Sequence, residues 1–488
     1  MSARALCAIG IVATLGATTD PQPAGTPWSA AQIGALQMRL DAALAAPELR
    51  GAHVGLLAID TVRGSLLYAR DADDEFTPAS NLKLLVGSAA LHDLGPSFRF
   101  QTSLSSDAPP HDGVIAGNLY LRGGGDAHLN ASDLRDAALS LKRSGIVAID
   151  GSLVTDASHD DEVRYPPGWA WDDLPYEYAA PVTALELEGG VVHVYVTPGA
   201  SPGDPVGLRI EPSSGAFTVE NRAVTGPAGS QDSTDVVRPW DSPLTIRIVG
   251  SYPAGAPESD DLEPSAPNPQ AYAGDVALQA LSSAGITVAG GVRAGITPRS
   301  TNLLWRHESV PMAQLLANFW LPSDNLMGEL FVKELGVARD GEPGSDANGI
   351  AAELAYAQSI GVDPSTLSIA DGSGTSAYDR ITPRDLVRIL QSDWTGPQRA
   401  VVLDALPEAG VRGTLADRFS ATLLRMRVFA KTGTETHVRA LSGFLQTDEH
   451  GPVTFSLLLN DWLGDDRPDS AAQLQRIEAA LLLPFTER

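Results

Sequence analysis

The pattern of apolar residues changes twice along the chain, and these two changes limit the possible folds more than any other feature. Apolar spacing predicts a helix over 26–48, a β-hairpin over 54–69 and a buried helix over 77–91. From about residue 100, short apolar runs alternate with Gly, Pro, Asp and Ser. This pattern predicts short strands, within 114–121, 146–154, 191–196, 208–210 and 244–249.

Apolar residues at helical spacing return in the second half of the chain, after a Pro- and acid-rich loop over 254–269. Periodicity predicts helices at 271–283, 311–335, 382–390 and 471–483, with strands at 427–434, 438–446 and 453–460. The order of these segments is that of an α/β domain interrupted by a long, separate β-rich insertion.

The charge balance excludes two classes of partner. The 488 residues contain 34 Lys and Arg against 60 Asp and Glu, a formal net charge of −26. Nucleic-acid binding and docking on an anionic membrane both need basic patches. We therefore expect no nucleic acid and no membrane surface as partner. Lysine is scarce, since only four occur: Lys83, Lys142, Lys333 and Lys431.

The N-terminus predicts export. An apolar run over 5–17 follows Arg4 and ends in small residues, so residues 1–19 resemble a secretory signal; the alternative is a buried N-terminal helix. No other stretch could span a bilayer. We expect an exported mature chain without a transmembrane anchor, soluble or loosely attached to the wall, in the periplasm or outside the cell. The only cysteine, Cys7, lies in the signal, which excludes an intramolecular disulfide and thiolate zinc sites.

The first candidate catalytic motif is Ser80-Asn81-Leu82-Lys83, preceded by Thr77-Pro78. Thr is an acceptable N-cap and Pro suits the first helical position, so Ser80 falls in the first turn, where its N–H lacks an intrahelical partner. Thr77 Oγ could compete for that N–H. Lys83 shares a helix face with Ser80, and its apolar neighbours could desolvate it into a base. The alternative is a chance spacing on a helix surface.

Two further motifs follow in the second half of the chain. Ser323-Asp324-Asn325 separates two helical stretches and can present a hydroxyl and an amide, although Ser and Asn are also ordinary helix caps. Lys431-Thr432-Gly433-Thr434 ends a predicted strand. It offers a cation and a hydroxyl, and Gly433 permits close approach of another backbone. The alternative is a strand that reaches a turn.

These three motifs in this order are the signature of penicillin-binding proteins and class A β-lactamases. From about residue 29 the chain resembles the class C, low-molecular-mass penicillin-binding proteins of actinobacterial type. These are the D-alanyl-D-alanine carboxypeptidases/endopeptidases of peptidase family S13. Other segments also resemble the family, at 121–126, 169–185, 371–374, 382–383, 406–415 and 441–443.

The resemblance implies an α/β fold of the penicillin-binding/β-lactamase-like transpeptidase type, an antiparallel sheet between helices interrupted by β-rich domains. Residues 29–99 and 290–488 would form the catalytic domain. Residues 100–180 and 246–289 would form inserted domain II, and 181–245 inserted domain III. The long separation of Ser80 from Ser323 excludes a single-domain β-lactamase, and no glutamate deacylation loop is identifiable.

The resemblance also implies a mechanism on peptidoglycan stem peptides. Ser80 would attack the carbonyl between the two terminal D-alanines, and Lys83 would take its proton. Ser323, with Lys431, would relay a proton to the leaving amine, while Asn325 would hydrogen-bond the substrate amide. Water would then release the acyl-enzyme. The same chemistry could cleave cross-links, and a β-lactam would acylate the serine and remain there as an inhibitor.

Substrate contacts are implied at the third motif and in the insertion. Thr432, with Lys431, would hold the terminal carboxylate beside Gly433, and the N–H groups of Ser80 and Thr434 would form the oxyanion hole. Asp173 and Tyr178 match positions that help to bind the amino end of the third stem residue. The alternative is a surface acid and a packed aromatic ring.

Two positions depart from the family pattern. Glu435 replaces an apolar residue after the third motif, and Ala377 replaces a basic residue. Glu435 would favour a cationic side chain in the substrate, or it would pair with Arg439 and touch no substrate.

Two other functions remain open from the sequence. One is a non-catalytic or repurposed wall- or β-lactam-binding protein of the same fold, and the other is an esterase or amidase. We expect no cofactor and no metal, because no histidine falls in His-Glu-x-x-His, and His53 and His193 are interpreted as packing or surface residues.

Overall fold

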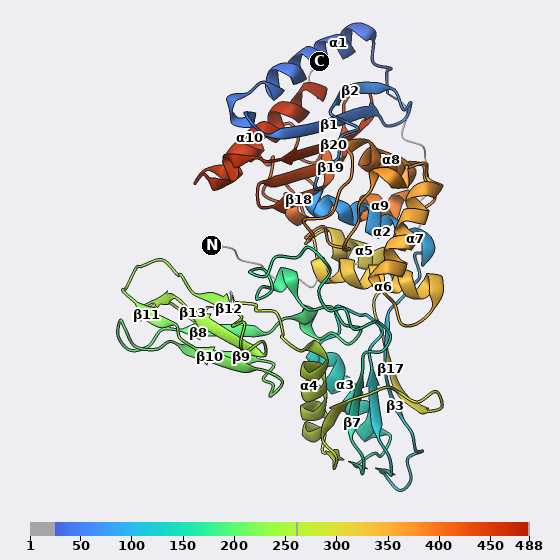
Figure 1. The fold of residues 1–488 in the computed structure, drawn as a ribbon, viewed down its shortest axis with the longest axis vertical. Helices are drawn as coiled ribbons and strands as arrows, with labels where there is room; N and C mark the ends of the chain where they lie inside the picture. Colours follow the sequence, from blue (N-terminus) through green and yellow to red (C-terminus); the bar gives the residue numbers. More distant parts are fainter. Residues whose placement is uncertain (1–24, 260–261, 487–488) are drawn as a thin grey trace.

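The computed structural model describes residues 25–259 and 262–486 (Figure 1). The predicted signal peptide, residues 1–19, lies outside the described residues. Within the described ranges, no helix is both long and apolar enough to cross a membrane.

A five-stranded antiparallel sheet joins the two ends of the chain, in the order β18-β19-β20-β1-β2. The predicted hairpin and the three predicted C-terminal strands form this sheet, so the fold class is confirmed. The strands are β1 (His53–Asp60), β2 (Leu66–Arg70), β18 (Val428–Glu435), β19 (Val438–Gln446) and β20 (Pro452–Asn460). β18 is an edge strand, which leaves one side of its backbone free to meet a ligand.

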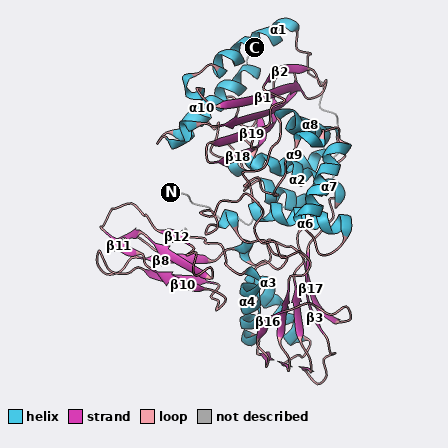
Figure 2. Ribbon diagram, viewed as in Figure 1, coloured by secondary structure: helices cyan, strands magenta, loops and turns pink. Residues whose placement is uncertain are grey.

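Helices cover both faces of this sheet (Figures 1 and 2). α1 (Ala30–Leu44) and α10 (Ser470–Leu482) pack their apolar faces on one side. The other side carries a helical layer around a shared apolar core, made of α2 (Leu82–Asp93), α5 (Met312–Trp320), α6 (Asn325–Asp340), α7 (Asp346–Ser359), α8 (Pro383–Thr395) and α9 (Arg399–Ala405). α2 is buried on all sides from Leu82 to Leu91, Lys83 included.

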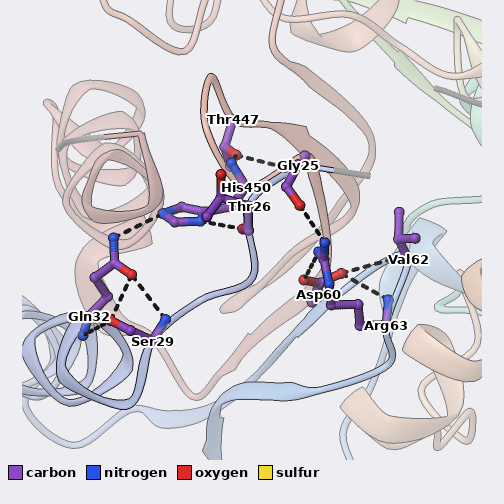
Figure 3. A network of polar contacts seen from close by, with 10 residues as sticks. Gly25, Thr26, Ser29, Gln32, Asp60, Val62, Arg63, Thr447 and His450 are labelled. Carbon is purple, nitrogen blue, oxygen red and sulfur yellow. Dashed lines mark hydrogen bonds and ion pairs between the residues drawn. The ribbon is translucent and has the colours of Figure 1, made fainter. Parts of the chain in front are cut away.

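A polar network connects the N-terminal segment to the five-stranded sheet that joins the chain ends, which we call the catalytic sheet (Figure 3). The His450 ring lies 2.7 Å from the Thr26 carbonyl oxygen and stacks on Trp28 at 3.9 Å between ring centroids. Arg63 pairs with Asp60 at 2.9 Å and donates to the Gly25 carbonyl oxygen. These contacts position the start of α1 against the loop between β19 and β20.

The middle of the chain forms further sheets and two helices. One five-stranded sheet has the order β16-β7-β5-β3-β17, beside a small sheet β15-β6-β4, and α3 and α4 pack on them. The elements are β3 (Gln101–Ser106), β4 (Val114–Ile115), β5 (Leu119–Arg122), α3 (Ala131–Arg143), β6 (Ala148–Ile149), β7 (Leu153–Asp156), α4 (Pro269–Ser283), β15 (Thr287–Val288), β16 (Val292–Ala294) and β17 (Asn302–Glu308).

Three smaller sheets form the green lobe at the left of Figure 1. They pair β8 with β9, β11 with β14, and β10 and β12 with β13. The strands are β8 (His193–Thr197), β9 (Gly207–Glu211), β10 (Thr218–Asn221), β11 (Val224–Gly226), β12 (Asp235–Val237), β13 (Thr245–Val249) and β14 (Ser251–Pro253).

Strand pairing differs from the predicted boundaries at two places. β16 and β17, expected in the catalytic part that starts at 290, pair with β7 and β3 of the middle sheet. β13 and β14, expected largely in the segment 246–289, pair with strands of 181–245. In both cases the chain completes a neighbouring sheet before it crosses to the next body.

The predicted helix over 77–91 begins differently from the expectation. Ala79 has φ +47°, outside the helical region, so a short 3-10 turn over Ala79–Asn81 precedes α2. Thr77 does not cap this turn; its Oγ1 accepts a hydrogen bond from Arg380 at 2.9 Å. The predicted competition between Thr77 and an oxyanion for the Ser80 N–H is therefore wrong.

Candidate active site

Ser80 and Lys83 form a hydrogen-bonded pair at the start of α2. Lys83 Nζ donates to Ser80 Oγ at 2.7 Å, and the lysine side chain is fully buried. Burial lowers the pKa of Lys83 to about 8, although nearby carboxylates, Asp371 first among them, act in the opposite direction. A lysine with this pKa is partly neutral near pH 8, so it can accept the serine proton.

The turn that carries Ser80 is tightly enclosed by glycines of two other segments. A Cβ on Gly374, which has φ +81°, would lie 2.0 Å from the Ala79 carbonyl oxygen. One on Gly433 would lie 2.9 Å from the Pro78 carbonyl oxygen. Asn81 Nδ2 also donates to the Lys431 carbonyl oxygen at 3.0 Å. The first and third motifs are thus in direct contact.

The second motif meets the first through Asn325. Lys83 Nζ donates to Asn325 Oδ1 and to the Ser373 carbonyl oxygen, both at 2.6 Å. Asn325 Nδ2 donates to the Tyr178 carbonyl oxygen at 2.8 Å and to Thr375 Oγ1 at 3.1 Å. The amide therefore connects the base to the insertion.

Ser323 and Lys431 form a second Ser–Lys pair beside the cavity. Ser323 has φ +67° in the loop between α5 and α6, and Lys431 Nζ donates to its Oγ at 2.7 Å. Lys431 is fully buried, and desolvation together with the charges of Lys83 and Arg418 lowers its pKa well below the ordinary value. This pair can pass a proton between a lysine and a hydroxyl.

The edge strand β18 offers backbone donors to the cavity. Ala430 N donates to the Pro407 carbonyl oxygen, away from β19, and the register shows no bulge. Because strand directions alternate with period two, the N–H groups of Thr432 and Thr434 also point off the sheet edge. Thr432 Oγ1 donates to Thr414 Oγ1 at 2.7 Å.

All these groups surround one cavity of about 470 Å³. Lys83, Lys431 and Gly433 lie behind its wall, and the other predicted site residues reach it. Its lining comprises Ser80, Asp173, Tyr178, Ser323, Asn325, Thr414, Thr432, Thr434, Glu435, Thr436, Arg439 and Asp465.

Comparisons with known proteins show the family of the chain. The model of the D-Ala-D-Ala carboxypeptidase 3 (S13) family matches residues 36–481. The chain belongs to this family. It is 35% identical to the D-alanyl-D-alanine carboxypeptidase of Actinomadura sp. (strain R39), over 91% of this chain and 84% of that protein.

Solved structures show the same fold. Penicillin binding protein 4 (dacB) from Haemophilus influenzae superposes with a TM-score of 0.83 at 23% identity, over 92% of this chain and 99% of that chain. The same protein complexed with a β-lactam superposes with a TM-score of 0.76 at 23% identity, over 92% and 100%.

The residues expected to select the substrate lie together in the S13 cavity. Tyr178 OH donates to Asp173 Oδ1 at 2.9 Å. Burial and the neighbouring Asp173 raise the pKa of Glu435 to about 7. Arg439 does not form the ion pair considered for Glu435; it donates to the Glu435 main-chain oxygen at 2.8 Å and pairs with Asp465. The Glu435 carboxyl group therefore lines the cavity with Asp173 and without a direct bond to Arg439.

Sequence reasoning missed several groups at the site. Thr414 lies in the 406–415 segment that resembles the family, which was the available signal. Asp465 follows β20 in a short turn and carried no motif. The Ser373 carbonyl oxygen could not be predicted, because a main-chain acceptor has no side-chain signature.

One group of possible metal ligands lies outside the cavity. His53, Asp71 and Asp74 could each offer an atom within 4.8 Å of the others, and both acids are exposed. The His53 ring stacks on Phe76 at 4.0 Å between centroids and contacts Asp74 at 3.3 Å. Stacking on Phe76, the contact of His53 with Asp74 and the ion pair of Asp71 with Arg70 explain the positions of these three side chains without a metal ion.

Proposed function

We propose that this S13 protein is a serine D-alanyl-D-alanine carboxypeptidase that acts on peptidoglycan stem peptides. The observation that carries the proposal is the pair of serines, each 2.7 Å from a buried lysine, that line one cavity. The names of the Actinomadura and Haemophilus relatives support this substrate class.

Acylation begins at Ser80. Its Oγ attacks the carbonyl carbon of the penultimate D-alanine while Lys83 takes the proton. The N–H groups of Ser80 and Thr434 stabilise the oxyanion; removal of one such donor typically costs about 10²–10³ in turnover. The carbon–nitrogen bond then breaks, and the proton taken by Lys83 reaches the leaving amine through Ser323 and Lys431.

Deacylation completes the reaction. Water attacks the ester on Ser80, and the serine recovers its proton as the shortened peptide leaves. Thr432 and Lys431 hold the terminal carboxylate, and Gly433 lets the substrate backbone approach β18.

A β-lactam forms the same ester, but its leaving group remains attached by the ring and obstructs water. The β-lactam complex of the Haemophilus protein supports inhibition of this kind.

The wall substrate is consistent with an exported enzyme. We propose that residues 1–19 direct export and that the mature chain acts outside the cytoplasmic membrane.

Release of D-alanine tests the substrate directly. Purified protein and a stem pentapeptide ending in D-Ala-D-Ala should give free D-alanine, whereas the epimer ending in D-Ala-L-Ala should not react. A cross-linked dimer in parallel measures endopeptidase action. Hydrolysis of simple esters without D-alanine release would contradict the proposal and favour an esterase, and no turnover of any substrate would favour a binding protein.

A further inference from the structure

The loop over residues 370–376 has no role in the mechanism above, yet it touches the base. The Ser373 carbonyl oxygen accepts from Lys83 Nζ at 2.6 Å, and Thr375 Oγ1 accepts from Asn325 at 3.1 Å. Gly374 packs against the turn before Ser80 so closely that a Cβ would clash. A small shift of this loop would therefore displace the Lys83 ammonium group.

Buried carboxyl groups hold the main chain of this loop. Gly372 N donates to Glu329 Oε2 at 2.9 Å, and Ala370 N donates to Asp379 Oδ1 at 2.7 Å. Burial raises the pKa of both Glu329 and Asp379 well above the ordinary values.

Asp371 has a different environment within the same loop. Its two oxygens accept four hydrogen bonds, from Gly374 N and Ser376 N at 2.7 Å, Trp169 Nε1 at 2.8 Å and Ser373 Oγ at 3.0 Å. These four hydrogen bonds fix the position of the Asp371 side chain, and its charge acts on the nearby base Lys83.

The Trp169 bond reaches Asp371 from the strap, the name we give to residues 165–178 of the insertion. Two further bonds join the strap to the end of the loop and the residue after it: Ser376 Oγ donates to the Pro167 carbonyl oxygen at 2.7 Å, and Ala377 N to that of Gly168 at 3.2 Å. The strap also carries Asp173 and Tyr178 into the cavity.

We propose that Asp371 is a positioning residue for Lys83, and that the Trp169–Asp371 bond connects the strap to the catalytic base. This inference rests on the proposed function. A substrate that contacts the strap then stabilises the loop that orients Lys83, although the strap lies far from the base in sequence.

The charges around Lys83 give the inference a signature in pH. The groups that raise the pKa of Lys83 are, in order, Asp371, Glu329, Asp324 and Glu435, and the second cation Lys431 also faces it. Loss of the Asp371 charge lowers the pKa of Lys83 further. The acid limb of acylation, which reports the deprotonation of the base, then moves to lower pH.

The test is the second-order rate of acylation by a fluorescent penicillin between pH 6 and 10. In Asp371→Asn the plateau rate should fall by about 10²-fold, the usual effect of a misplaced catalytic group, and the acid limb should move to lower pH. Trp169→Phe keeps an aromatic ring but removes the donor, and should fall by about tenfold, the weight of one hydrogen bond to a charged group. Trp171→Phe, an exposed strap residue, is the matched control and should behave as wild type.

Each outcome decides between the alternatives. An unmoved acid limb in a folded Asp371→Asn variant, or equal rates in Trp169→Phe and Trp171→Phe, would overturn the inference and leave the proposed function intact. If Asp371→Asn does not fold, the two tryptophan variants decide. A wild-type protein that is not acylated would instead contradict the proposed function and the inference together.

Discussion

Lys83 shows how a single side chain acquires its chemistry from burial. Its ammonium group is fully buried, with Ser80, Asn325 and the Ser373 carbonyl oxygen as its acceptors. Desolvation penalises the charged form, and the surrounding acids limit that effect, so the pKa is about 8 and not lower. A base whose pKa lies close to the working pH is efficient in proton transfer.

At the same scale, Glu435 should control the preference for amino-bearing substrates. Its pKa of about 7 means that it is mostly neutral at pH 6 and charged at pH 8. The ratio of kcat/KM for a stem peptide with a free side-chain amine to that for its acetylated form should rise by up to about tenfold over this range, as one ion pair allows. The ratio cancels the titration of Lys83, which affects both substrates.

The variant Glu435→Gln should remove this pH dependence. Asp172→Asn, an exposed acid of the strap that does not line the cavity, should retain it. The same slope in Glu435→Gln as in the wild type would show that the glutamate does not contact the substrate amine.

At the scale of the element, the loop 370–376 packs directly against the turn before α2, which carries Ser80. Gly374→Ala should lower the acylation rate by about 10²-fold, because the new Cβ must displace the nucleophile's turn. It also adds about 1–2 kcal/mol of backbone strain at positive φ.

Gly361→Ala is the matched control for that strain. Gly361 has φ +84°, and its Cβ would meet only the flexible Arg388 side chain. Both variants should lose stability in thermal unfolding from the positive φ, Gly374→Ala more because its Cβ also meets backbone, but only Gly374→Ala should lose acylation. Comparable acylation in the two variants would contradict the tight fit of loop and turn.

Elements with strong local patterns were predictable, and those that depend on distant partners were not. The apolar strands β18 to β20 and the buried helix α2 were predicted from sequence, as was α10. α3 was missed, although Asn130 and Asp133 form a capping box at its start, because the surrounding region has a β-rich texture. The short strands β10, β11 and β14, which lie outside the predicted strand segments, depend on pairing with distant segments, which no local pattern specifies.

At the scale of the whole molecule, the insertion is part of the active site. The catalytic sheet and its helices surround two apolar cores, and the middle region has a third of its own. The strap returns from that region to the cavity, where the Tyr178 carbonyl oxygen accepts from Asn325 at 2.8 Å. The three motifs were predictable because they are local. The boundaries at 246 and 290 came from the family resemblance, whereas strand pairing assigns the flanking residues to neighbouring sheets.

The measurement that tests the central claim most directly is the intact mass of the protein after incubation with benzylpenicillin, followed by peptide mapping. The account predicts one covalent adduct with the mass of the intact antibiotic, located on the peptide that contains Ser80 and absent from Ser80→Ala. Absence of an adduct on the wild type, or an equal adduct on Ser80→Ala, would contradict the account.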